Sequence, residues 1–357
     1  MEPVKPFRLG VVEGFFGKSW SWDARTQYAQ FLSGNGFTTY LYAPKNDDYF
    51  RKHWSQPCPQ KHLDSLTRLS SHYGDAGIEF AIGLSPFELY RDFSSSGQDA
   101  LAMKLEEINA INPDTFCILF DDMHGDVENL AATQLQIMDF VTRHSKARHY
   151  IFCPTYYSDD PALEKFFGVK PANYLEDLGN QLDSRIDIFW TGPKVISTGF
   201  PEEHLQQITE TLQRKPLLWD NYPVNDSEKL TKHLHLSPFE NRSAELKSLA
   251  QGHMANPMNQ ARLSQLPLYS LGKLYNDDGA NMNNLLEEAC NVLCPAKLGS
   301  QLFQDAAMFQ DKGLDQLSDS DKAEIIARYM PFQDHPMVIE LLDWLKGEYA
   351  FDPECLT

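Results

Sequence analysis

Two adjacent carboxylates, Asp121 and Asp122, follow an apolar run from Thr115 to Phe120. Two carboxylates this close cannot both ionise without cost, and the usual result is one strongly raised pKa. A carboxyl group that keeps its proton near neutral pH can serve as a general acid. The spacing alone leaves one alternative open, in which the pair caps the helix that follows, with or without a contact to a metal ion.

The closeness of the pair restricts the chemistry that it can carry out. Most glycosidases that retain the anomeric configuration hold an acid and a nucleophile about 5–5.5 Å apart across the scissile bond, and inverting ones hold them further apart. Sequence neighbours are poorly placed to reach opposite faces of a sugar. A nucleophile supplied by the substrate itself fits two neighbouring carboxylates better.

Eight short apolar runs, most of which end on a polar residue, indicate the strands that position these side chains. The predicted strands are Arg8 to Glu13, Thr39 to Lys45, Glu79 to Ser85, Thr115 to Phe120, Tyr150 to Tyr157, Ile186 to Thr191, Pro216 to Asn221 and His253 to Asn256. In a parallel barrel the carboxyl ends of all strands meet on one face, which carries the active site. Because side chains alternate along a strand, Asp121 and Asp122 can face the same way only where the strand has ended, at the rim.

Stretches with helical spacing lie between these runs. The predicted helices are Asp23 to Asn35, Gln60 to Gly77, Asp99 to Asn109, Leu130 to Ser145 and Leu263 to Tyr275. Alternating strands and helices predict an α/β fold with parallel strands. An open doubly wound sheet is the alternative, but no Gly-rich phosphate loop follows the first strand, and polar residues follow nearly every strand. We therefore expect a (β/α)₈ TIM barrel with a small C-terminal all-α domain.

The chain of 357 residues exceeds the roughly 250 residues of such a barrel. We expect residues 1–276 to form the catalytic barrel and residues 277–357 to form the helical domain, joined by a linker at 276–281. That domain would pack on the barrel or on a second copy in a homodimer. Its predicted helices are Asn281 to Cys294, Gly299 to Gln310, Ser320 to Tyr329 and Pro336 to Tyr349, with Ser320 as an N-cap that lacks a capping box.

The composition excludes several classes of partner. A net charge of −19 would repel a nucleic acid, and no apolar run approaches the length of a membrane span. The six cysteines are scattered, which indicates reduced thiols, and Cys290 and Cys294 have no nearby His or third Cys, as a zinc site would need. We expect no metal and no cofactor. No apolar signal segment is visible at the N-terminus, so the sequence predicts a cytoplasmic protein.

Six motifs, in order over residues 8–257, resemble the successive strand ends of glycoside hydrolase family 84. They are Gly-Val-Val-Glu-Gly-Phe-Phe-Gly at 10–17, Tyr-Leu-Tyr-Ala-Pro-Lys at 40–45, Phe-Asp-Asp at 120–122, Phe-Cys-Pro-Thr at 152–155, Trp-Thr-Gly-Pro-Lys at 190–194 and Trp-Asp-Asn at 219–221. This family contains β-N-acetylglucosaminidases, including the O-GlcNAcases and enzymes long described as hyaluronidases. Six motifs in the correct order are far more specific than one Asp-Asp pair.

The resemblance implies a retaining exo-enzyme that releases terminal β-linked GlcNAc from a glycoconjugate or oligosaccharide, with the substrate's 2-acetamido group as nucleophile. It implies that Asp121 orients the acetamido N–H, while Asp122 protonates the leaving oxygen and then activates water. Contacts to the sugar would come from Gly14, Lys45, Cys153, Tyr157, Trp219, Asn221, Asp226 and Asn256. The alternatives are ordinary core packing for Tyr157 and Trp219, and a surface ion pair for Lys45 and Asp226.

The sequence departs from the family pattern at Phe16, where relatives usually have Tyr, and at Tyr156, where human-like enzymes have Glu. The motifs concern only the GlcNAc ring, so the aglycone stays open among protein O-GlcNAc, cell-wall fragments, and chitin or glycosaminoglycan oligosaccharides. Two alternative functions remain. One is a GlcNAc-binding barrel without turnover, which would not need an acid. The other is a chitinase or hexosaminidase, although this chain lacks the acidic patterns ending in Glu that those enzymes carry.

Overall fold

Eight parallel strands close into a barrel in the computed structural model, which describes residues 5–277 and 284–351. The strands pair in chain order, and β1 closes the ring against β8. They are β1 (Arg8–Glu13), β2 (Thr39–Tyr42), β3 (Glu79–Leu84), β4 (Thr115–Leu119), β5 (His149–Cys153), β6 (Asp187–Trp190), β7 (Leu217–Asp220) and β8 (Gly252–Ala255). The TIM barrel is thereby confirmed, because a closed ring excludes the open sheet.

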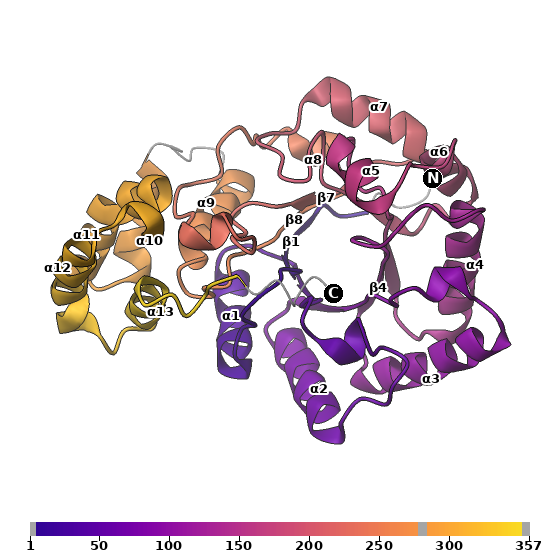
Figure 1. The fold of residues 1–357 in the computed structure, drawn as a ribbon, viewed down its shortest axis with the longest axis horizontal. Helices are drawn as coiled ribbons and strands as arrows, with labels where there is room; N and C mark the ends of the chain where they lie inside the picture. The colour runs from indigo at the N-terminus through magenta and orange to yellow at the C-terminus, as the bar shows by residue number, and fades with distance from the viewer. Residues whose placement is uncertain (1–4, 278–283, 352–357) are drawn as a thin grey trace.

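Helices surround this ring (Figure 1). They are α1 (Trp22–Gly34), α2 (Gln60–Asp75), α3 (Ser95–Ile111), α4 (Leu130–His144), α5 (Pro161–Phe167), α6 (Tyr174–Gln181), α7 (Glu202–Leu212), α8 (Leu246–Leu249) and α9 (Gln265–Asn276). Four of the five predicted barrel helices agree within two residues at each end, and α3 begins four residues earlier than expected. The shorter helices α5 to α8 had no individual prediction, because four to eleven residues give little periodic signal.

The strands are buried on both faces, which explains why they form continuous apolar runs. Two predicted strands extend too far, since β2 ends at Tyr42 and β5 ends at Cys153. The residues that follow them, 43–45 and 154–157, lie in loops but are buried. The sequence pattern therefore extends both predicted strands into these loops. These loops follow the carboxyl ends of β2 and β5, at the barrel mouth.

The C-terminal helices pack on one side of the barrel, next to α9 (Figure 1). They are α10 (Leu285–Leu293), α11 (Ala296–Ala307), α12 (Asp319–Tyr329) and α13 (Pro336–Leu345). Their apolar side chains share one cluster with barrel residues such as Met258 and Leu263. The boundary at residue 276 and dimerisation through these helices stay predictions. Most of the linker predicted at 276–281 lies outside the described residues. The same is true of the start of the first helix predicted for the C-terminal domain.

The prediction of Ser320 as an N-cap is wrong. Ser318 caps α12, and its side chain accepts a hydrogen bond from the backbone N–H of Asp321 at 3.1 Å. The Asp321 carboxylate in turn accepts from the backbone N–H of Ser318 at 2.9 Å, which completes a capping box. The pattern was missed because an Asp takes the position where Glu or Gln is usual.

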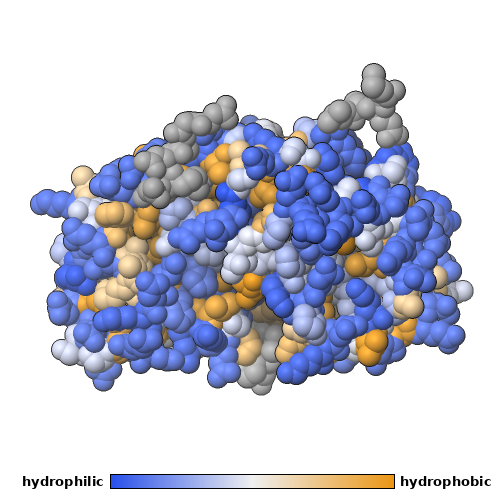
Figure 2. Space-filling view, turned by 90° about the horizontal axis from the view of Figure 1, so that it is seen from above, coloured by the Kyte–Doolittle hydropathy of each residue, from blue (hydrophilic) through white to orange (hydrophobic). Residues whose placement is uncertain are grey.

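Most of the surface in Figure 2 is hydrophilic, and its apolar residues form small separate areas. Among the described residues, most large apolar side chains instead lie in two internal clusters, one around the barrel and one under the C-terminal helices. Within residues 5–277 and 284–351, no helix has both the length and the apolar character that a membrane crossing requires.

Candidate active site

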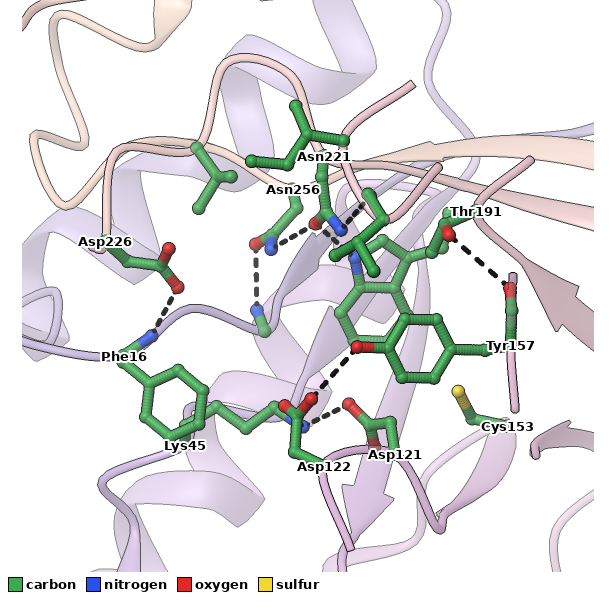
Figure 3. A pocket seen from close by; sticks show the side chains of 15 residues that line it. Phe16, Lys45, Asp121, Asp122, Cys153, Tyr157, Thr191, Asn221, Asp226 and Asn256 are labelled. Carbon is green, nitrogen blue, oxygen red and sulfur yellow. Dashed lines mark hydrogen bonds and ion pairs between the residues drawn. The ribbon is translucent and has the colours of Figure 1, made fainter. Parts of the chain in front are cut away.

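A pocket opens at the carboxyl ends of the strands (Figure 3). It is lined by all ten residues that the sequence predicted for the site: Gly14, Lys45, Asp121, Asp122, Cys153, Tyr157, Trp219, Asn221, Asp226 and Asn256. Five further residues complete its wall: Phe16, Thr191, Val195, Ile196 and Val224. Every strand except β3 contributes, directly or through the loop after it. The barrel therefore gathers residues that are up to 242 positions apart in the chain.

The carboxylate pair lies in a turn directly after β4. The strand ends at Leu119, and Asp122 adopts a left-handed backbone conformation with φ of 57°. This conformation costs an L-residue about 1–2 kcal/mol, and it reverses the strand alternation so that both carboxylates reach the pocket. The alternative role as a helix cap is excluded, because α4 begins much later and has Asn129 at its N-cap position.

Lys45 lies between the two carboxylates. Its ammonium forms an ion pair with Asp121 and lies 3.6 Å from Oδ2 of Asp122. Its side chain is only 2% exposed, so this contact is not the surface ion pair considered as an alternative. Burial works to lower the pKa of Lys45, but the two carboxylates outweigh it, and the net shift is upward. The lysine therefore stays positively charged inside the pocket.

Asp121 is the buried member of the pair. Its side chain is 6% exposed, whereas that of Asp122 is 23% exposed. Burial raises the pKa of Asp121, and the charge of Asp122 adds to this effect while Lys45 opposes it. Oδ1 of Asp121 is buried and has no hydrogen-bond partner among the described residues. This oxygen is therefore a ready acceptor for a donor that enters the pocket.

Tyr157 and Cys153 lie beside the pair, on the β5 side. The hydroxyl of Tyr157 donates a hydrogen bond of 3.0 Å to Oδ1 of Asp122. Burial raises the pKa of Tyr157 well above 10, so the hydroxyl keeps its proton and remains a donor. Burial likewise raises the pKa of Cys153, whose neutral thiol can act as a small apolar surface.

Hydrogen bonds connect four residues that form another part of the pocket wall: Gly14, Trp219, Asn221 and Asn256. Oδ1 of Asn221 accepts hydrogen bonds from Nε1 of Trp219 and from Nδ2 of Asn256, both at 2.9 Å. The backbone N–H of Gly14 donates to Oδ1 of Asn256 at 3.3 Å. A side chain at Gly14 could not be accommodated, since its Cβ would lie 2.4 Å from the Trp219 ring. The glycine thus allows the backbone to approach the indole closely.

Asp226 is a third carboxylate in the pocket. The backbone N–H of Phe16 donates to its Oδ2 at 2.9 Å. Burial raises the pKa of Asp226 to about 6, with the Phe16 N–H opposing the shift and the charge of Asp122 adding to it. No ion pair to Asp226 is found among the described residues, so the alternative of a surface ion pair does not apply.

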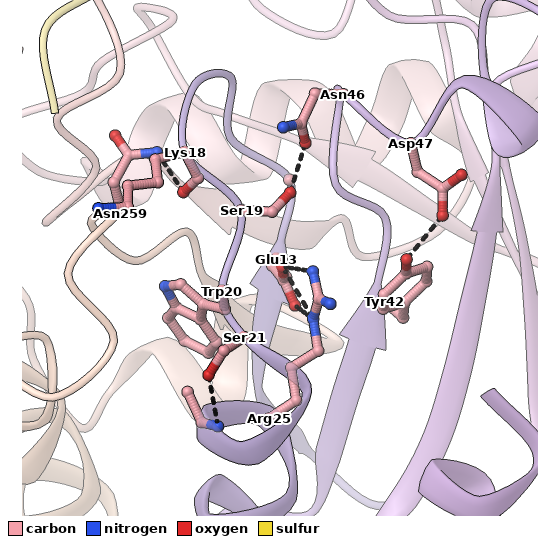
Figure 4. A network of polar contacts seen from close by, with 12 residues as sticks. Glu13, Lys18, Ser19, Trp20, Ser21, Arg25, Tyr42, Asn46, Asp47 and Asn259 are labelled. Carbon is pink, nitrogen blue, oxygen red and sulfur yellow. Dashed lines mark hydrogen bonds and ion pairs between the residues drawn. The ribbon is translucent and has the colours of Figure 1, made fainter. Parts of the chain in front are cut away.

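The loop that carries Gly14 and Phe16 is fixed by its neighbours (Figure 4). Nδ2 of Asn259 donates to the carbonyl of Phe16 at 2.8 Å, and Ser19 donates to Asn46 at 2.6 Å. Glu13 ends the first predicted strand yet does not line the pocket. It is fully buried and forms an ion pair with Arg25. Nε of Arg25 donates to Oε2 of Glu13 at 2.9 Å, and Nη2 donates to Oε1 at 2.6 Å. This ion pair attaches β1 to α1 below the site.

The pocket residues that were not predicted are mostly apolar or act through the backbone. Val195, Ile196 and Val224 lie in loops, where an aliphatic residue has no distinctive signal. Thr191 ends the sixth predicted strand, and its backbone N–H donates to the carbonyl of Tyr157 at 2.9 Å. In the part of the chain that the structure describes, no group of three or more His, Cys, Asp and Glu side chains is arranged to hold a metal ion.

The chain is similar to known β-N-acetylglucosaminidases. The family model of β-N-acetylglucosaminidase matches residues 9–306. The protein O-GlcNAcases of Rattus norvegicus and Mus musculus are each 30% identical over 295 residues, which is 80% of this chain and 31% of each relative. The chain thus spans about a third of the length of these relatives.

A solved structure of a mutant O-GlcNAc hydrolase from Thermobaculum terrenum aligns with a TM-score of 0.77 and 28% identity. The alignment covers 96% of this chain and 81% of the hydrolase chain. It therefore includes the barrel and most of the C-terminal helices. Together with the family match over most of the chain, these similarities show that the chain belongs to glycoside hydrolase family 84, the β-N-acetylglucosaminidases.

Proposed function

We propose that this protein is an exo-acting β-N-acetylglucosaminidase that retains the anomeric configuration and uses the substrate's 2-acetamido group as nucleophile. The observation that carries the proposal is Oδ1 of Asp121, a buried acceptor without a partner among the described residues, beside Asp122. The N–H of an acetamido group is a donor that suits this oxygen. A hydrogen bond there would turn the acetamido carbonyl oxygen toward the anomeric carbon and stabilise the positive charge that develops on nitrogen.

Asp122 would be the general acid and base. The raised pKa belongs to Asp121, but the ion pair with Lys45 and the acetamido N–H would keep Asp121 a hydrogen-bond acceptor rather than a proton donor. The side chain of Asp122 is the more exposed of the two, which supports a place on the side from which a leaving group would depart and water would arrive. In the first step the acetamido oxygen bonds to the anomeric carbon, the glycosidic bond breaks, and the Asp122 proton moves to the leaving oxygen. In the second step Asp122 takes a proton from water, whose oxygen displaces the acetamido oxygen and restores the β configuration.

The remaining polar groups would hold the sugar. Lys45, Asp226 and Asn256 would contact ring hydroxyls at the closed part of the pocket, which favours a terminal residue over the interior of a chain. Tyr157 and Asn221 would contact the acetamido group, with the Cys153 thiol near its methyl and the Trp219 ring forming the wall. The rat and mouse relatives are named protein O-GlcNAcases, so we propose O-linked GlcNAc on protein as the substrate.

The proposal is tested by the hydrolysis of an aryl β-GlcNAc and of the matching aryl β-glucoside, which lacks the acetamido group. Substrate-assisted catalysis requires rapid release of the phenol from the first and almost none from the second. Equal rates on both would exclude the acetamido group as nucleophile. Release of GlcNAc from a glycopeptide, compared with a chitobioside and a muropeptide, then tests the substrate. Failure on the glycopeptide alone would reject only the protein substrate.

A further inference from the structure

Asp220 is a buried carboxylate between two pocket residues. It is the last residue of β7, flanked in the chain by Trp219 and Asn221, and it is fully buried. Its Oδ2 lies 2.9 Å from Nε2 of His253 and accepts a hydrogen bond of 2.8 Å from Nε of Arg242. Its Oδ1 accepts from Nη2 of Arg242 at 2.7 Å. The guanidinium thus binds the end of β7 through two parallel hydrogen bonds.

Arg242 uses all five of its N–H donors. Besides the two to Asp220, it donates to the backbone carbonyls of Ser197 and Thr198, both at 2.9 Å, and of Glu240 at 2.7 Å. Three aromatic rings flank the guanidinium, with centroids at 5.6–5.8 Å from its carbon: Phe200, Tyr222 and Phe239. The side chain is 4% exposed. A lysine could not reproduce this arrangement, since it has three donors on a single nitrogen.

The contacts of Arg242 connect two segments that form the same part of the pocket wall. Ser197 and Thr198 directly follow Val195 and Ile196, and Asp220 directly precedes Asn221. The two segments also meet at the pocket surface, where Nδ2 of Asn221 donates to the carbonyl of Val195 at 2.8 Å. Arg242 therefore fixes, from behind, the distance between the end of β7 and the loop after β6.

We propose that Arg242 is a positioning residue for the reaction, acting through Asp220 and the 195–198 loop to set the width of the pocket at Asn221. The inference rests on the proposed function, in which Asn221 contacts the acetamido group. A shift of about 1 Å in such a group can reduce a rate about a hundredfold. Loss of the five-donor contact would thus impair catalysis and relax the fit around the acyl group.

The chain offers a matched control in Arg214. Its guanidinium also donates five hydrogen bonds, to the backbone carbonyls of Gly179, Leu182, Asp183, Ile186 and Leu212. These carbonyls precede β6 and β7, so Arg214 joins the same two strands at their amino ends, away from the pocket. A substitution at Arg214 removes a comparable set of backbone contacts without affecting the site.

The test compares Arg242→Lys, Arg214→Lys and the wild type well below their melting temperatures. The substrates are aryl β-glycosides of glucosamine that carry an N-acetyl or an N-butyryl group. We expect both variants to melt several degrees lower than the wild type. Arg242→Lys should lower kcat/KM on the N-acetyl substrate about tenfold to hundredfold and reduce the preference for N-acetyl over N-butyryl. Arg214→Lys should keep kcat, KM and the acyl preference within about twofold of the wild type.

The outcomes separate this inference from the proposed function. An inactive wild type would overturn both. An active wild type with an unchanged acyl preference in Arg242→Lys, or with equal kinetic losses in the two lysine variants, would overturn the positioning role alone. If Arg242→Lys does not fold, Asp220→Asn provides the same measurement with a side chain of equal size. Failure of both to fold, while Arg214→Lys folds, would assign the contact to folding and reject a role in positioning.

Discussion

The hydroxyl of Tyr157 donates a hydrogen bond of 3.0 Å to Oδ1 of Asp122, and burial keeps that hydroxyl protonated. In the proposed first step Asp122 becomes negatively charged as it gives up its proton, and a hydrogen bond to a charged group contributes about 1.5–3 kcal/mol. We therefore predict that Tyr157→Phe lowers kcat/KM on an aryl β-GlcNAc about tenfold to hundredfold. The matched control is Tyr156→Phe, because the Tyr156 hydroxyl donates to the carbonyl of Gly168 at 2.7 Å and does not line the pocket. Equal kinetic losses in both variants would contradict a specific role for Tyr157.

Because Asp121 and Asp122 have different proposed roles, the rates of variants at the two positions should depend differently on the leaving group. Asp122→Asn should slow substrates with poor leaving groups far more than aryl glycosides, because a phenolate departs with little protonation. Asp121→Asn should slow both kinds of substrate, since the acetamido group must attack whichever group leaves. Rates of both variants on an aryl glycoside and on an alkyl glycoside decide the matter. If Asp121→Asn were the variant that selectively slows poor leaving groups, the two proposed roles would have to be exchanged. The same leaving-group dependence in both variants would indicate that the two carboxylates act as one coupled pair.

The raised pKa of Asp226 predicts that substrate binding depends on pH. Burial raises its pKa to about 6, so the carboxylate takes up a proton as the pH falls through 6 and becomes a weaker acceptor for sugar hydroxyls. KM of the wild type should therefore rise, by up to roughly tenfold, between pH 7 and pH 5. In Asp226→Asn, KM should be high throughout and nearly constant over that range. A variant that keeps the wild-type rise in KM would show that another group titrates.

Glu340 predicts a pH dependence of stability. It lies on α13 and accepts hydrogen bonds of 2.8–3.0 Å from the backbone N–H groups of Arg262 and Leu263. Burial raises its pKa to about 7, against the opposing effect of those N–H groups, whereas an unfolded Glu titrates near about 4.3. Between these values the folded state binds more protons, so stability falls as the pH rises.

The test for Glu340 is the melting temperature of the wild type and of Glu340→Gln at pH 5 and pH 8. The melting temperature of the wild type minus that of the variant should decrease from pH 5 to pH 8, because the amide cannot ionise. Since all other titrating groups are the same in both proteins, the difference isolates Glu340. A difference that is constant or increases would contradict the prediction.

The barrel could be predicted because its strands are buried on both faces, which produces apolar runs that end at the same face of the fold. That geometry also brought the ten predicted site residues together, although their individual roles stay predictions. The helices that could be predicted one by one are long, whereas α5 and α8 have seven and four residues. Local periodicity carries too little information for such short elements.

The polar networks behind the site could not be predicted. Arg242 lies in an irregular loop, and nothing in its local sequence indicates that it reaches Asp220, 22 positions earlier. Glu13 ends the first predicted strand, where a site residue would be expected, yet it pairs with Arg25 inside the fold. Such contacts depend on tertiary distances between buried charges, which the spacing of residues along the chain does not record.

The central claim is that the acetamido carbonyl oxygen is the nucleophile, and fluorine substitution of the acetyl group tests it most directly. Fluorine withdraws electrons from that oxygen while changing the size of the group little. The measurement is kcat/KM on aryl β-glycosides with N-acetyl, N-fluoroacetyl, N-difluoroacetyl and N-trifluoroacetyl groups. Acetamido participation predicts a steady fall in kcat/KM with each fluorine, amounting to orders of magnitude across the series. A kcat/KM that does not change with fluorine content would contradict it.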